Sequence, residues 1–118
     1  MSFSEILRKV TEDVEGSRGA AVVGMDGIAV DEFLKSPGVD LQSMGAEFGN
    51  VLKVVEQASG SLRMGDPREM AVMTEAGELL IRKINEDYFL ALLMGPGANL
   101  GKGRFAARIA AGMLEKEF

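Results

Sequence analysis

The chain of 118 residues contains no cysteine and no histidine, and it has only three prolines. Without cysteine and histidine the protein cannot form disulfides, use a thiol nucleophile or an imidazole in catalysis, or offer the usual ligands of zinc. No apolar run reaches the roughly 18 residues of a membrane span. The first residues also lack the basic-then-apolar order of a signal peptide. We therefore expect a cytoplasmic protein that holds no metal and no cofactor.

Basic residues are in the minority, because 13 Lys and Arg stand against 18 Asp and Glu and the net charge is −5. They are also scattered along the chain, so we expect neither a nucleic-acid backbone nor an anionic membrane as a partner. Other proteins are the better candidates. The hydrophobic content of 47% and the few prolines argue against long disordered stretches. The sequence predicts a single domain over residues 1–118.

Three acidic doublets, at 12–13, 31–32 and 86–87, are the candidates for a catalytic carboxylate pair. The first doublet lies in a predicted helix and the second in a predicted strand. Adjacent side chains on a helix or a strand do not face each other, so these doublets cannot readily share a proton. Solvated charge is the better interpretation, and we expect no enzyme activity.

Hydrophobic periodicity predicts three helices and five strands. The helices are expected at 3–15, over about 19 residues from 41, and from 100 to about 116, and the strands at 20–23, 28–33, 70–73, 79–84 and 88–94. The element order is then αββαβββα. Because the last strand is apolar at consecutive positions, we expect helices on both faces of the sheet and this strand at its centre.

Caps and apolar stripes refine these helices. Ser2 with Glu5 forms a capping box, and Asp40 and Asn99 are expected N-caps. The loop at 59–68 is expected to be tucked against the domain through its apolar residues. The expected core stripe of the second helix is Leu41, Met44, Phe48, Val51, Leu52 and Val55, and that of the last helix is Phe105, Ala106, Ile109, Ala110 and Met113.

A glycine-rich segment at 95–103 joins the last strand to the last helix. Such a segment can cradle a phosphate at a helix N-terminus. However, no Ser or Thr follows Lys102, and the chain after the glycines is too short for a dinucleotide-binding unit. The segment is better interpreted as a strand-to-helix corner capped by Asn99.

The second helix carries the strongest indication of a protein interface. Gly45 and Gly49 cost helix stability, so we expect close contact with another helix to offset them, the alternative being close contact with the chain's own sheet. The strand at 70–73 would be an apolar edge that pairs with a second copy. The predicted dimer interface is Gly45, Gly49, Met70, Ala71, Val72 and Met73. The opposite face of the helix, which we expect to bind a partner, is Gln42, Ala46, Asn50, Lys53 and Gln57.

Arg104 and Arg108 lie one turn apart on the last helix. They could point at one acidic partner, Arg104 could contact a phosphate, or both could be surface arginines on a solvated face. The sequence leaves these alternatives open.

The element order, the hairpin turn Met25-Asp26-Gly27-Ile28, the meander at 75–80 and the corner Asn99-Leu100-Gly101-Lys102-Gly103-Arg104 together resemble the Roadblock/dynein light chain family, and within it a bacterial MglB-like member. The resemblance implies a profilin-like, three-layer α-β-α fold with a five-stranded antiparallel sheet and the long second helix on one face. It also implies a homodimer formed through the third strand and the second helix. Members of this family are non-enzymatic scaffolds and regulators of small Ras-like GTPases, or motor light chains, and some accelerate GTP hydrolysis by their partner.

Two other functions remain open from the residues alone. One is a ligand-sensing module that holds an apolar molecule between the sheet and the second helix. The other is a structural adaptor whose binding does not depend on the nucleotide state of a partner.

Overall fold

The computed structural model describes residues 1–118, and its eight elements follow the predicted order αββαβββα. The helices are α1 (Phe3–Asp13), α2 (Leu41–Ser61) and α3 (Leu100–Glu115). The strands are β1 (Ser17–Gly24), β2 (Ala29–Leu34), β3 (Glu69–Met73), β4 (Glu78–Lys83) and β5 (Tyr88–Met94). No helix combines the length and the apolar character that crossing a membrane requires.

The five strands form one antiparallel sheet in the order β2-β1-β5-β4-β3. The prediction that the last strand is central is confirmed, because β5 is the middle strand. β3 pairs only with β4, so the prediction that it is an edge is also confirmed. An edge strand leaves a row of unpaired backbone N–H and C=O groups, and β3 is therefore open to pairing with another chain.

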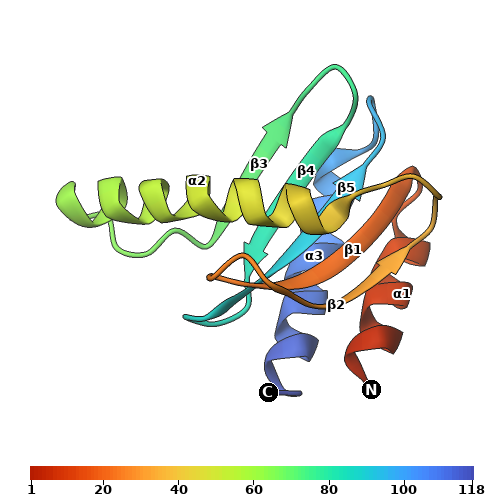
Figure 1. Ribbon diagram of the computed structural model, residues 1–118, viewed down its shortest axis with the longest axis horizontal. Helices are drawn as coiled ribbons and strands as arrows, with labels where there is room; N and C mark the ends of the chain where they lie inside the picture. Colours follow the sequence, from red (N-terminus) through yellow and green to blue (C-terminus); the bar gives the residue numbers. More distant parts are fainter.

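The sheet lies between two helical layers, with α2 across one face and α1 beside α3 on the other (Figure 1). Alternation along β5 explains its unbroken apolar sequence, since successive side chains enter opposite cores. Those facing α2 are Phe89, Ala91 and Leu93, and those facing α1 and α3 are Leu90, Leu92 and Met94. The core under α2 has 9 buried residues and the other has 15, so α2 is held by fewer apolar side chains.

The helix ends form where the sequence places their caps. The Ser2 hydroxyl accepts a hydrogen bond from the Glu5 N–H, and the Glu5 carboxylate accepts one from the Ser2 N–H, which confirms the capping box. Asp40 accepts from the N–H of Ser43 at the start of α2, and Asn99 accepts from that of Lys102 at the start of α3. Each cap satisfies an N–H that would otherwise have no partner within its helix.

The second helix and the loop after it differ from the prediction. α2 has 21 residues instead of about 19, and its last turns project past the edge strand β3 (Figure 1). Leu62 is 71% exposed and Met64 is 75% exposed, so the prediction that this loop is tucked against the domain is wrong. Neither side chain packs against either of the two hydrophobic cores.

The core face of α3 also differs from the prediction. Phe105 is 59% exposed and Ile109 is 48% exposed, although both were predicted to be core residues. The helix instead packs on the sheet mainly through small residues. Its buried residues are Gly103, Ala107, Ala110, Ala111 and Leu114. A Cβ at Gly103 would lie 2.6 Å from the sulfur of Met94, so α3 sits too close to β5 for large side chains on this face.

Candidate dimer and partner interfaces

An apolar stripe of α2, which we call the α2 seam, is only partly covered by the sheet. Its residues are spaced alternately four and three apart, as in helices that pair with one another. The seam consists of Met44, Phe48, Val51, Val55 and Ala58, followed by Leu62 just after the helix. Val51 is 43% exposed, so the prediction that it is a core residue is wrong. The helix directs Leu41 and Leu52 to the sheet. Because adjacent helical residues lie about 100° apart, Val51 is turned away from the sheet.

The β3 edge adjoins the α2 seam. Met44 and Phe48 of the seam and Val72 of β3 line the same small apolar hollow of ≈ 160 Å³. Met70 packs partly on the core under α2, whereas Ala71 is exposed and Met73 is 66% exposed. Met70 and Val72 thus extend the apolar surface of the α2 seam, whereas Ala71 and Met73 lie on the opposite face of β3, because successive side chains of a strand alternate.

The two α2 glycines face the other way. A Cβ at Gly45 would lie 2.9 Å from a methyl carbon of Val23, and one at Gly49 would lie 3.4 Å from the ring of Phe89. Both glycines are buried against the chain's own sheet. Their predicted place in the dimer interface is therefore corrected: they permit close packing of α2 on β1 and β5, which is the alternative that the sequence left open.

The predicted partner face lies on the outer side of α2. Gln42, Asn50, Lys53 and Gln57 are exposed, and they carry a single charge, that of Lys53. Ala46 is half-buried, because the turn between β1 and β2 approaches it: a Cβ at Gly27 would lie 3.5 Å from Ala46. The structure thus brings these five residues to one side of the helix, away from the α2 seam.

One ion pair that sequence patterns did not indicate holds the C-terminal half of α2. The Lys83 ammonium donates a hydrogen bond of 2.6 Å to the Glu56 carboxylate, with side chains only 13% and 25% exposed. The pair joins α2 to the end of β4. It holds the helix where its apolar contacts with the sheet become sparse, and so it fixes the direction in which the α2 seam projects.

Electrostatics also stabilise the start of α2. The Ser43 hydroxyl donates to the Asp40 carboxylate over 2.7 Å, and the Ser43 N–H donates over 3.1 Å. These hydrogen bonds favour the ionised form and lower the pKa of Asp40 below its ordinary value of 3.8. The partner face thus begins at a helix end whose cap is charged at neutral pH.

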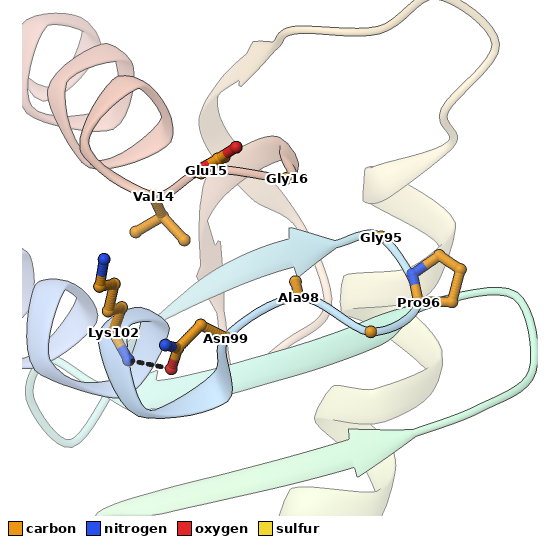
Figure 2. Close-up of a pocket in the computed structure, with 9 residues that line it drawn as sticks. Val14, Glu15, Gly16, Gly95, Pro96, Ala98, Asn99 and Lys102 are labelled. Atoms are coloured by element: carbon orange, nitrogen blue, oxygen red, sulfur yellow. Dashed lines mark hydrogen bonds between the residues drawn. The ribbon is translucent and has the colours of Figure 1, made fainter.

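The glycine-rich corner forms a hollow of ≈ 400 Å³ beside the turn that follows α1 (Figure 2). The Asn99 side chain caps the Lys102 N–H at 3.1 Å, and the Asn99 carbonyl accepts from the Gly103 N–H. These donors at the helix start are therefore already used, and the acidic Glu15 lines the same hollow. This arrangement supports a structural corner rather than a phosphate site. No group of three or more potential metal-ligating side chains lies together.

A five-stranded antiparallel sheet between one long helix and a helix pair, with an open apolar edge, defines a small interaction domain of the roadblock and profilin type. The chain belongs to the Roadblock/LC7 domain family, whose model matches residues 4–94. The family expected from the sequence is thereby confirmed. Among curated proteins, none matches the sequence.

Solved structures support the family and the fold. The chain is 36% identical to MglC from Myxococcus xanthus, with 100% of both chains covered and a TM-score of 0.72. Myxococcus xanthus MglB shares 13% identity over 98% of this chain and 94% of its own, with a TM-score of 0.88. Profilin II from Acanthamoeba castellanii shares 15% identity over 98% of each chain, with a TM-score of 0.66. The last two likenesses establish the fold, and they confirm its predicted profilin-like character.

Proposed function

We propose that this protein is a cytoplasmic, non-enzymatic regulator that forms a homodimer and binds a small Ras-like GTPase. The observation that carries the proposal is the division of α2 into two surfaces. Its seam is apolar and partly uncovered, whereas its outer face is polar and solvent-exposed. One helix can therefore bind a second copy on one side and a different protein on the other.

The proposed dimer uses the α2 seam together with β3. Pairing of two β3 edges would satisfy their free backbone groups and join two sheets into one. It would also cover Met70, Ala71, Val72 and Met73, while seam residues of the two copies pack against each other. Gly45 and Gly49 are not part of this interface, because they face the chain's own sheet.

The proposed GTPase-binding surface is the outer face of α2, formed by Gln42, Ala46, Asn50, Lys53 and Gln57. The expectation of a GTPase partner comes from the family to which the chain belongs. This face contains no arginine that could enter a GTPase active site. If the protein accelerates GTP hydrolysis, it therefore does so by holding the catalytic groups of the GTPase in their active arrangement.

A nucleotide-indifferent adaptor is the second candidate. It would bind through the same outer face of α2, which is polar and exposed in this chain and needs no nucleotide-dependent contact. A ligand-sensing module is less well supported, because the hollow of ≈ 160 Å³ beside α2 is well below the roughly 300 Å³ of ordinary ligand pockets.

The test is capture of partners from native cell lysate, with the protein as bait, in GDP and in a non-hydrolysable GTP analogue. Retention of a small GTPase only with the GTP analogue would support the regulator. Retention regardless of nucleotide would favour the adaptor. The Lys53→Glu variant should lose the GTPase, whereas Lys35→Glu, which reverses an exposed charge outside α2, should retain it. Equal retention by the two variants would exclude the proposed face.

A further inference from the structure

The outward side of α3 carries an apolar patch that the proposed dimer and partner interfaces do not use. Phe105 is 59% exposed and Ile109 is 48% exposed. Both side chains line an open groove of ≈ 710 Å³ between α1 and the first turns of α3. Lys9 and Asp13 form the α1 side of this groove. We call this surface, together with the hollow on the other side of Phe105, the α1/α3 groove.

That second hollow has a volume of ≈ 290 Å³ and lies between Phe105 and the β3–β4 edge of the sheet. Phe105 and Gly101 line both hollows, so the Phe105 ring forms a ridge between them. The Arg108 guanidinium carbon lies 5.9 Å from the centre of this ring. An aromatic ring and a cation are thus held side by side at the surface, and the cation remains free to accept an anionic partner.

The charge around the groove is opposite in sign to that of the whole chain. The groove is lined by five basic residues (Lys9, Arg82, Lys102, Arg104, Arg108) and two acidic ones (Asp13, Glu69). Both acids are already paired: Asp13 binds Lys9 at 3.0 Å, and Glu69 binds Arg104 at 2.6 Å and Arg82 at 3.7 Å. Lys102 and Arg108 have no carboxylate within ion-pair distance.

These ion pairs distinguish the two arginines of α3, whose partners the sequence left open. Arg104 donates from its Nε to the Glu69 carboxylate over 2.6 Å, so part of its charge is already paired within the chain. Arg108 is the unpaired member, and it lies over an exposed aromatic ring. The pair does not share one acidic partner within the chain.

We propose that the α1/α3 groove binds an acidic segment of another protein. A large apolar side chain of that segment packs against Phe105 and Ile109, and neighbouring carboxylates pair with Arg108 and Lys102. Charge complementarity selects this occupant, because the groove has an excess of cations in a chain with a net charge of −5.

Other occupants fit less well. A second copy placed groove to groove would bring the unpaired cations of both copies together, which is repulsive. An anionic membrane would be attracted by the groove but repelled by the rest of an acidic chain. The groove also lies on the opposite face of the sheet from α2 (Figure 1), so this proposal and the proposed function can fail independently.

The test begins with a random-peptide display library selected against the purified protein at physiological salt. Enriched peptides are synthesised with a fluorophore, and their affinities are measured by fluorescence anisotropy. We expect the enriched peptides to contain Asp or Glu beside a large apolar residue. Phe105→Ser and Arg108→Glu should each weaken binding about tenfold or more, because each removes a central contact.

Matched variants distinguish this groove from the rest of the surface. Ile28→Ser removes an apolar side chain that is 62% exposed in the β1–β2 turn, and Lys116→Glu reverses an exposed charge at the end of α3. Both should leave affinity within about twofold of the original, as substitutions outside an interface do. A peptide whose acids are replaced by lysine should bind Arg108→Glu better than the unmodified protein. Circular dichroism melting curves confirm that each variant is folded.

The proposal is overturned if no peptide is enriched, if the enriched peptides lack acidic residues, or if their binding does not respond to Phe105→Ser and Arg108→Glu. It is also overturned if the protein binds vesicles of phosphatidylserine and phosphatidylcholine through Arg108 while acidic peptides do not compete.

Discussion

At the scale of single residues, one buried side-chain oxygen lacks a hydrogen-bond partner, and it belongs to the carboxylate of Glu78 at the start of β4. The residue is only 8% exposed, and its Oε2 atom is buried without a hydrogen-bond donor. A buried acceptor without a partner costs free energy, and a charged one costs more. We predict that Glu78→Gln raises the free energy of unfolding at pH 7 by about 1 kcal/mol, since it removes the charge at nearly constant volume.

Urea denaturation of the variant and the unmodified protein measures this difference. Glu75→Gln is the matched control, because it removes an exposed charge from the neighbouring turn and should change stability little. A Glu78→Gln variant that is less stable than the original would show that the carboxylate has an essential partner.

The glycines of α2 give a second prediction at this scale. Alanine is favoured over glycine inside a helix by about 1 kcal/mol. At Gly45, however, the new Cβ would lie 2.9 Å from one methyl carbon of Val23 and 3.3 Å from the other. Val23 is fully buried and its branched side chain has little freedom to move. We predict that Gly45→Ala lowers the free energy of unfolding by about 1 kcal/mol or more, because overpacking outweighs helix propensity.

Gly60 provides the comparison within the same helix. A Cβ at Gly60 meets no atom within 4 Å, so Gly60→Ala should stabilise the protein by about 0.5 kcal/mol. Chemical denaturation of both variants tests the pair of effects. If both substitutions stabilised the protein, α2 would not be held against β1 as closely as the structure indicates.

At the scale of elements, Asp40 couples the start of α2 to pH. Its hydrogen bonds from Ser43 lower its pKa in the folded protein below 3.8, the ordinary value. The stabilisation is therefore complete above pH 3.8 and is lost as the pH falls through the lower pKa of the folded state. We predict that Asp40→Asn, which retains a capping side chain but cannot titrate, loses less stability than the original between neutral pH and about pH 2.

Thermal melting followed by circular dichroism across this pH range measures the effect. Glu5 also has a lowered pKa through its hydrogen bonds with Ser2, but it is present in both proteins and cancels in the comparison. Identical pH profiles would show that the Asp40 cap contributes nothing to acid stability.

Elements with a strong local signal were predicted well from the sequence. The Ser2–Glu5 capping box, the consecutive apolar residues of β5 and the strand-to-helix corner at Asn99 depend on neighbouring residues, so their patterns are readable without the fold. The core face of α3 was not predicted well, because the small residues that fit close to the sheet give a weak hydrophobic signal. The pattern instead favoured Phe105 and Ile109, which are large but exposed.

The candidate interfaces show the same limit. The residues of the outer α2 face were grouped correctly, since helical periodicity alone decides which side chains share a side. The direction in which Gly45 and Gly49 face was not predicted correctly, because it depends on where α2 lies over β1 and β5. Likewise, the exposure of Val51 depends on how α2 is rotated over the sheet, and that of Leu62 depends on how far α2 projects past it, and no local pattern contains either.

At the scale of the whole molecule, exposed apolar side chains gather where α2 leaves the sheet. Val51, Val54 and Leu62 are 43%, 63% and 71% exposed. An apolar patch of this kind beside an open strand edge is costly to leave in water. Self-association through the α2 seam and β3 would cover the apolar patch and pair the open strand edge in one interface.

We therefore predict a particle of twice the chain mass of 12.6 kDa by size-exclusion chromatography with light scattering. Val51→Glu should weaken the dimer by about 100-fold or more, because it places two like charges in an apolar helix pair. Lys53→Glu, only two positions away but on the outer face, should leave the dimer intact. A monomer in the unmodified protein, or a Val51→Glu variant that remains dimeric on dilution, would contradict the proposed interface. If the dimer forms and only Val51→Glu dissociates it, the seam rather than the outer face joins the two copies, and Lys53 remains available to a partner.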